Sequence, residues 1–171
     1  MEITNLFIFS RVVRWAAENR ATTHERVDAV FGETELVLDL PHNTYEPLGD
    51  GGVIIRKGSV RLQPDELSLL PSHMAGDVVL IKAKEKVNEV LNSMIHGTGR
   101  AMSRSDCKPL ADACDFDALR ESVLIPCGVD DSSLRTDGPF AYRGLDHCLA
   151  LINEHVDVTV RFGVVGYVGH L

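Results

Sequence analysis

Apolar residues near the amino terminus recur every three or four positions, which is the spacing of one face of an α-helix. This pattern predicts a helix over residues 4–31. Gly32 ends the pattern, since glycine is frequent just past the end of a helix. The segment fits one long helix or two shorter ones equally well.

The middle of the chain changes to patterns that are typical of strands. The alternating residues 35–40 predict a short strand, and the β-branched segments 53–62 and 77–83 predict two more. Proline, asparagine and glycine are concentrated in residues 41–52, which we expect to form a loop. Residues 69–77 are expected to form the loop between the second and third strands.

The last third of the chain returns to helical spacing. Ser103 or Ser105 could cap a helix that runs through Ala113, because a serine hydroxyl can accept a bond from the first turn. A further amphipathic pattern predicts a helix over residues 144–155. The valine-rich residues 156–168 predict one long strand or a bent pair.

These elements, with no internal repeat or low-complexity linker, predict one α+β domain over residues 1–171, with a mixed β core and flanking helices. The hydrophobic share of 44% and the charged share of 25% are typical of a globular protein. A net charge of −8 argues against broad, sequence-independent binding of nucleic acid, although a local basic patch remains possible. We find no membrane-spanning run and no signal-peptide pattern, so we expect a cytoplasmic protein.

The cysteines also favour an intracellular protein. No two of them are separated by only two residues, which is the spacing of many zinc and redox sites. We therefore expect reduced thiols. The four are Cys107, Cys114, Cys127 and Cys148.

The most distinctive segment is HGTGRAMSR, residues 96–104. Gly97 and Gly99 allow a ligand to approach the backbone, whose N–H groups could hold a phosphate. Arg100 could add a charge-assisted contact, and His96 could then attack a phosphorus atom. The alternative is a tight turn with a surface histidine and solvated arginines, and this segment alone favours that alternative.

Other polar residues are weaker candidates. His42, where the first strand meets its loop, could bind a metal ion, although a histidine in a loop is more often an ordinary polar residue. Lys57 could bind a phosphate, although an exposed lysine at a strand end is the commoner outcome. We expect Asp130, Asp131 and Asp137 to be turn residues in a loop.

Seven short segments stand in a fixed order along the chain: WAAENR, PHN, RKGSV, LLPSHMAG, HGTGRAMSR, FAYRGLD and VDVTVRFGVVGYV. In this order the chain resembles the carboxy-terminal portion of the RtcB family of RNA-splicing ligases. The pattern of that family includes a His-Asn pair, Arg-Lys-Gly-Ala, Gly-Ser-Met-Gly, His-Gly-Ala-Gly-Arg-x-Met-Ser-Arg and Ala-Tyr-Lys-Asp-Ile-Asp. The resemblance spans nearly all of the chain.

The resemblance implies a GTP- and manganese-dependent enzyme that joins RNA 3′-phosphate or 2′,3′-cyclic phosphate ends to 5′-hydroxyl ends, as in tRNA splicing and RNA repair. It implies that His96 attacks the α-phosphate of GTP and carries GMP, and that His42 binds manganese. Both histidines should then lie on one concave face. The nucleotide-binding residues that the resemblance implies are Gly97, Thr98, Gly99, Arg100, Asn43, Lys57, Ser72 and Met74.

The chain departs from the family pattern where most metal ligands are expected. The three upstream segments that hold the other manganese ligands are absent, the chain ends in YVGHL instead of Lys-Gly, and Arg143 replaces the usual lysine. We therefore expect a truncated ligase, incomplete without a polypeptide that supplies the amino-terminal half, as from a split gene or an internal start. The alternative is a decayed, catalytically inactive remnant that binds RNA ends or a protein.

Overall fold

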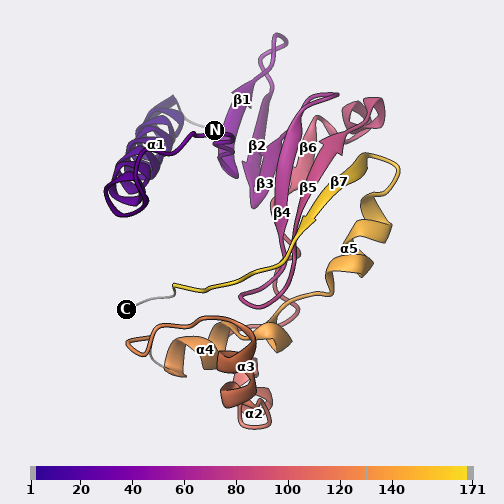
Figure 1. The fold of residues 1–171 in the computed structure, drawn as a ribbon. Coiled ribbons are helices and arrows are strands. Elements are labelled where there is room, and N and C mark those ends of the chain that lie inside the picture. Colours follow the sequence, from indigo (N-terminus) through magenta and orange to yellow (C-terminus); the bar gives the residue numbers. More distant parts are fainter. Residues whose placement is uncertain (1–2, 130, 169–171) are drawn as a thin grey trace. The chain divides into compact units, whose positions relative to one another are not determined.

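The computed structural model describes residues 3–129 and 131–168. Its contacts divide the chain into a first unit, Met1–Arg61, and a second unit, Leu62–Leu171. Helices and antiparallel sheets are both present, which confirms the α+β class (Figure 1). Within the described residues, no helix is both long and apolar enough to cross a membrane. A single domain over the whole chain stays a prediction.

The first unit begins with one long helix, α1 (Ile3–Phe31), so the helix predicted over residues 4–31 is confirmed and is continuous. Gly32 follows with φ +87°, and its N–H donates to the carbonyl oxygen of Asp28 at 2.9 Å. Glycine adopts this left-handed conformation without the steric cost that a side chain brings. The helix therefore ends where the sequence predicts.

A hairpin of two antiparallel strands, β1 (Asn43–Pro47) and β2 (Val53–Lys57), follows in the first unit. Asn43 lies opposite Lys57 at its open end. The loop predicted over residues 41–52 is therefore wrong for the part that forms β1. Its polar residues are held as a strand because β2 supplies a complete ladder of backbone partners.

Two strand predictions in the first unit also need correction. Residues 35–40 form no strand, and no strand of the described chain pairs with them. An alternating pattern gives a strand only where a neighbour accepts its backbone hydrogen bonds. The segment 53–62 forms two strands, β2 and β3 (Ser59–Arg61), because Gly58 between them takes φ +69° and interrupts the extended backbone.

The core of the second unit is a three-stranded antiparallel sheet in the order β4 (Leu67–Pro71), β5 (Val78–Ala83) and β7 (Val156–Phe162) (Figure 1). One face of this sheet carries Leu70 and Ile81, which are completely buried. Alternate residues of a strand point to opposite faces, so this burial follows from the period of the apolar positions.

The strands of this sheet confirm some of the sequence predictions and correct others. The strand predicted over residues 77–83 is confirmed by β5. The loop predicted over residues 69–77 is wrong for its first three residues, which belong to β4 because β5 pairs with them. Of the segment 156–168, residues up to Phe162 form a strand, and Gly166 makes only an isolated bridge, to Leu124.

Short helices make up the rest of the second unit. Ser103 accepts the Asp106 N–H at 3.3 Å, but the helical turn begins after Arg104, whose side chain makes no cap, and the helical turns end at Ala111 instead of the predicted Ala113. Helix α4 (Asp131–Asp137) contains Asp131 and Asp137, so the turn predicted there is wrong, while Asp130 lies outside the described residues. Helix α5 (Leu145–Ile152) confirms the helix predicted over 144–155 except for its last three residues, which form a turn. The remaining elements are η1 (Glu85–Val90), β6 (Ser93–Ile95), η2 (Ser105–Cys107), α2 (Lys108–Ala111), α3 (Phe116–Ser122), α4 (Asp131–Asp137), η3 (Pro139–Ala141) and α5 (Leu145–Ile152).

All four cysteines are free of disulfide bonds in the structure, and their reduced state stays a prediction. Cys107 and Cys148 are buried and behave as small apolar residues of the second unit.

Besides the buried residues of the sheet, the second unit has a second cluster of buried apolar side chains. This second cluster contains Met74 together with side chains from α3, α4 and the segment between them. Its other buried members are Leu119, Val123, Ile125, Val129 and Leu134.

Candidate functional site

The loop His96–Arg100 directly follows β6 and lies against the end of β4. The Thr98 N–H donates to the carbonyl oxygen of Pro71 at 3.1 Å, and its hydroxyl donates to the carbonyl oxygen of Ser72 at 3.3 Å. Thr98 is only 4% exposed. The structure thus brings together Thr98 and Ser72, two of the predicted site residues that stand 26 positions apart.

The opposite side of the loop is held by the segment before α5 and by α5 itself. The Arg143 N–H donates to the carbonyl oxygen of Gly99 at 3.0 Å. The Cys148 thiol donates to the carbonyl oxygen of Thr98 at 3.7 Å. The backbone around His96 is therefore fixed from two directions before any ligand binds.

Both glycines of the loop are required by its own geometry. A Cβ atom on Gly97 would lie 3.1 Å from the carbonyl oxygen of Pro71, and Gly99 has φ +69°. A side chain at either position would push the loop away from β4 or strain its backbone. The two glycines therefore serve the fold as well as any ligand that approaches them.

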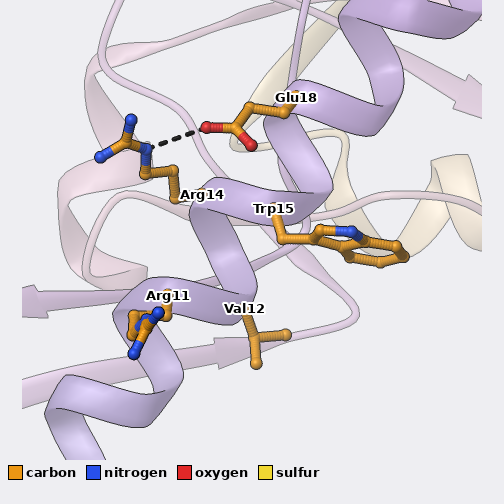
Figure 2. Close-up of a pocket in the computed structure, with 5 residues that line it drawn as sticks. All are labelled: Arg11, Val12, Arg14, Trp15 and Glu18. Atoms are coloured by element: carbon orange, nitrogen blue, oxygen red, sulfur yellow. Dashed lines mark hydrogen bonds and ion pairs between the residues drawn. The ribbon is translucent and has the colours of Figure 1, made fainter.

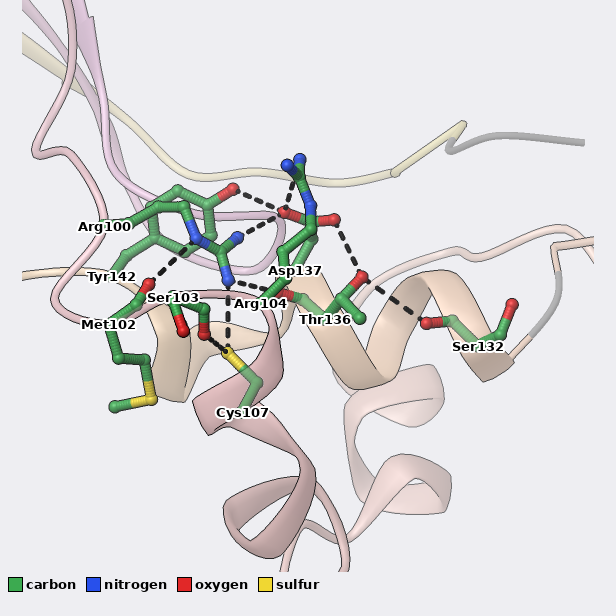
Figure 3. Close-up of polar contacts among 9 residues, drawn as sticks. All are labelled: Arg100, Met102, Ser103, Arg104, Cys107, Ser132, Thr136, Asp137 and Tyr142. Carbon is green, nitrogen blue, oxygen red and sulfur yellow. Dashed lines mark hydrogen bonds and ion pairs between the residues drawn. The ribbon is translucent and has the colours of Figure 1, made fainter.

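Arg100 uses all three nitrogens of its guanidinium inside the protein (Figure 3). It donates to Asp137 at 2.6 Å and to the carbonyl oxygens of Thr136 at 2.6 Å and Met102 at 3.1 Å. Its Nη2 also lies 3.1 Å from the sulfur of Cys107. The side chain is 23% exposed, so Arg100 joins the loop to the end of α4 in a largely enclosed position.

Asp137 is the acceptor at the centre of this network (Figure 3). Besides Arg100, it receives bonds from the hydroxyls of Thr136 at 3.1 Å and Tyr142 at 3.2 Å, and Arg104 lies 3.7 Å away. Burial and the negative charge of Asp137 raise the pKa of the Tyr142 hydroxyl. Arg100 also lies over the Tyr142 ring, with Cζ 5.5 Å from its centroid.

The predicted residues of the 72–77 loop direct their side chains into the protein. The Ser72 hydroxyl donates to the carbonyl oxygen of Asp77 at 2.8 Å, and Met74 is 7% exposed in the second cluster. His73 between them is half-buried, and this burial lowers its pKa, against a smaller opposing effect of Asp77. Sequence reasoning did not single out His73, whose only signal was its place beside Ser72.

The remaining predicted residues meet at the open end of the hairpin in the first unit. The carbonyl oxygen of His42 accepts the N–H groups of Gly58 at 2.8 Å and Ser59 at 3.2 Å. Asn43 also accepts from the Gly58 N–H, at 3.3 Å, and stands opposite Lys57. His42, Asn43 and Lys57 are all exposed there. That His42 and His96 share one concave face stays a prediction.

Among residues 3–129 and 131–168, no three His, Cys, Asp or Glu side chains are grouped so that they could hold a metal ion. A manganese site needs several such ligands, and His42 supplies only one. The described residues therefore do not fit a complete manganese site.

Helix α1 carries a shallow pocket that sequence reasoning did not predict (Figure 2). Trp15 is 65% exposed and Val12 is 56% exposed, and Arg14 pairs with Glu18 at 3.0 Å. The signal was present in the sequence, because these residues recur at helical spacing. The lining residues are Arg11, Val12, Arg14, Trp15 and Glu18.

The chain matches the family described as tRNA-splicing ligase RtcB over residues 9–166, a range that contains the His96–Arg100 loop and the exposed end of the hairpin. No curated protein matches the chain. Because the family match covers more than half of the sequence and contains every predicted site residue, the chain belongs to the RtcB tRNA-splicing ligase family.

Proposed function

We propose that this chain is the nucleotide-accepting half of a GTP- and manganese-dependent RNA ligase. Membership of the RtcB family supports an RNA ligase-type function and RNA as the class of substrate. In the proposed reaction a neutral imidazole nitrogen of His96 attacks the α-phosphorus of GTP and pyrophosphate leaves. The bound GMP then passes to an RNA 3′-phosphate, and a 5′-hydroxyl displaces it as the two RNA ends are joined.

The observation that supports this proposal most is the fixed loop that begins at His96. Hydrogen bonds to Pro71, Ser72 and Arg143 hold its backbone. A nucleophile on a backbone that is already ordered loses little freedom when its substrate binds, so more of the binding energy is left for the reaction. Gly97 and Gly99 carry no side chain, so a phosphate group can approach the backbone of the loop closely.

The proposal includes a partner polypeptide, because the described residues do not fit a complete manganese site. Large exposed apolar side chains in the first unit support such a partner, since contact surfaces are often apolar. Trp15 is 65% exposed, Val30 76% and Phe31 80%. A cytoplasmic location, in keeping with four free thiols, belongs to the same proposal.

The second candidate function is a binding module for RNA ends that performs no catalysis. The specific observation in its favour is the pairing of Arg100 with Asp137 at 2.6 Å, which neutralises a charge that a reacting phosphate would need. Under this alternative the chain binds RNA ends and forms no adduct with GMP, with or without a partner.

An adduct assay with α-labelled GTP and manganese separates the two candidates. We expect an acid-labile protein adduct only when the chain is mixed with an RtcB segment that bears the missing ligands. His96→Ala should abolish the adduct, whereas His147→Ala, which changes an exposed histidine of α5, should retain it. An adduct on His96→Ala would exclude His96 as the nucleophile. No adduct in any mixture, together with binding of RNA 3′-phosphate ends, would favour the binding module.

A further inference from the structure

Three arginines surround the His96–Arg100 loop, and two of them share one carboxylate. Arg100 lies 2.6 Å and Arg104 3.7 Å from the same oxygen of Asp137. To bind a phosphate, Arg100 must give up Asp137 and the carbonyl oxygen of Thr136. Its position therefore favours a role in holding the loop over a role in binding an anion.

The third arginine, Arg143, is placed differently. Its side chain is exposed, and one terminal nitrogen lies 3.0 Å from the point that a Cβ atom of Gly99 would occupy. Its guanidinium thus lies against the bare backbone of the loop. Within the described chain no carboxylate pairs with it. The backbone N–H of Arg143 donates to the carbonyl oxygen of Gly99 at 3.0 Å, and this bond fixes the position from which the side chain extends.

We infer that Arg143, and not Arg100, supplies the positive charge that contacts the phosphate groups of a nucleotide bound at this loop. The inference rests on the proposed function, because it takes the His96–Arg100 loop as the nucleotide site. A guanidinium with uncompensated charge attracts phosphate oxygens more strongly than one already paired with a carboxylate, and it can bind two of them at once. Gly99 contributes by leaving space in which the phosphate reaches that guanidinium.

Arg100 is then a positioning residue. It joins the loop to Thr136 and Asp137 at the end of α4, so that Gly99 and Arg143 are presented in a fixed arrangement. This division of roles predicts different results for the two arginines. Removing Arg143 should weaken anion binding without changing the fold, whereas removing Arg100 should disturb the fold itself.

Binding of sodium tripolyphosphate and of GTP to the full chain, without metal, tests the inference. Calorimetry gives the affinity, and the amide signals of Gly97 and Gly99 report whether the anion reaches the loop. We expect Arg143→Met to weaken both probes about tenfold or more, with Arg143→Lys in between, because a charge-assisted bond to phosphate is lost. Arg135→Met, which removes the same charge from α4 where Arg135 pairs with Asp112, should change binding less than about twofold.

The outcomes separate this inference from the proposed function. If the wild-type chain binds the probes at the loop and Arg143→Met binds them equally well, the inference is overturned while a nucleotide site at the loop stands. If the wild-type chain moves neither glycine signal with either probe, the inference is overturned, while the adduct assay with the partner segment still decides the proposed function. Circular dichroism of each variant confirms that a loss of binding does not reflect unfolding, which the exposed position of Arg143 makes unexpected.

Discussion

The first and second units bury their side chains to very different extents. The second unit contains completely buried residues such as Leu70 and Leu134, whereas among residues 8–61 of the first unit the buried ones are Val60 and Arg56 alone. Its helix α1 has exposed apolar residues along much of its length. Most folding free energy comes from such burial, so the second unit holds most of the stabilising core.

The same difference separates the two groups of predicted site residues. The His96–Arg100 loop is fixed against β4 and α5, which belong to the buried core. His42, Asn43 and Lys57 instead project from the open end of a two-stranded hairpin, a structure that is only marginally stable by itself. A motif backed by a core can be ordered before a ligand binds, whereas a motif on an exposed hairpin gains order from whatever covers it.

A matched pair of leucine truncations tests the contrast in burial and should give the largest effect. Leu70→Ala removes a completely buried side chain from β4 and should lower the free energy of unfolding by roughly 2–5 kcal/mol, because it leaves a cavity. Leu36→Ala removes a side chain that is 60% exposed and should cost about 0.5 kcal/mol or less. Urea unfolding followed by circular dichroism measures both changes. Equal losses would show that Leu36 is covered in solution and would break the comparison.

The sequence predicted elements well where a local signal was sufficient. Helix α1 has regular apolar spacing and a terminal glycine, and both were visible in the sequence. The segment 35–40 alternates as a strand does but pairs with no strand of the described residues, whereas β1 has a polar composition and is paired with β2. Pairing is a contact between distant segments, so composition alone could not distinguish these two cases.

The candidate site shows the same limit. The sequence placed Ser72 and Thr98 in one site, and the structure brings them into contact. It also suggested that Arg100 binds phosphate, but nothing local indicates that Asp137, 37 residues later, would accept its hydrogen bonds. The end of α4 supplies these acceptors for Arg100, and only the folded chain contains that information, while a contact between Arg100 and phosphate stays a prediction.

Two ion pairs in the first unit extend the comparison of buried and exposed residues, because the same Glu→Gln substitution can be made in each. Arg56 is 2% exposed and donates to Glu46 at 2.8 Å, whereas Arg14 and Glu18 pair at the surface of α1. Glu46→Gln should destabilise the hairpin by about 1–3 kcal/mol, because a buried charge loses its counter-ion. Glu18→Gln should cost about 0.5 kcal/mol or less. Hydrogen exchange of the β1 and β2 amides measures the difference, and equal protection in both variants would contradict it.

The ion pair of Arg56 with Glu46 also predicts that the stability of the hairpin depends on pH. The hydrogen bond from Arg56 lowers the pKa of Glu46 below its ordinary value of 4.5. The stabilisation is therefore complete above that value and is lost as the pH falls through the lower pKa of the folded state. Wild-type hairpin protection should fall in acid, and Glu46→Gln should lose most of this dependence.

The smallest expected effect concerns His73 and tests how firmly the 72–77 loop is tied to the core of the second unit. Burial lowers the pKa of His73 below its ordinary value of 6.5, and its Nδ1 accepts the Ala75 N–H at 3.4 Å. Protonation would cost this acceptor and place a charge in a half-buried position. Between the folded and unfolded pKa values the unfolded chain binds more protons, so stability should decrease as the pH falls below 6.5.

His73→Gln removes this titration while keeping a polar side chain of similar size, so the variant should lose less stability between pH 7.5 and pH 5.5 than the wild type does. Urea unfolding at both pH values measures the two differences. His147→Gln, which changes an exposed histidine of α5, is the matched control and should retain the wild-type dependence. If His73→Gln keeps that dependence too, the imidazole is free to become charged. The 72–77 loop would then be as open to solvent as the hairpin end of the first unit, and the contrast between the two groups of site residues would not extend to this loop.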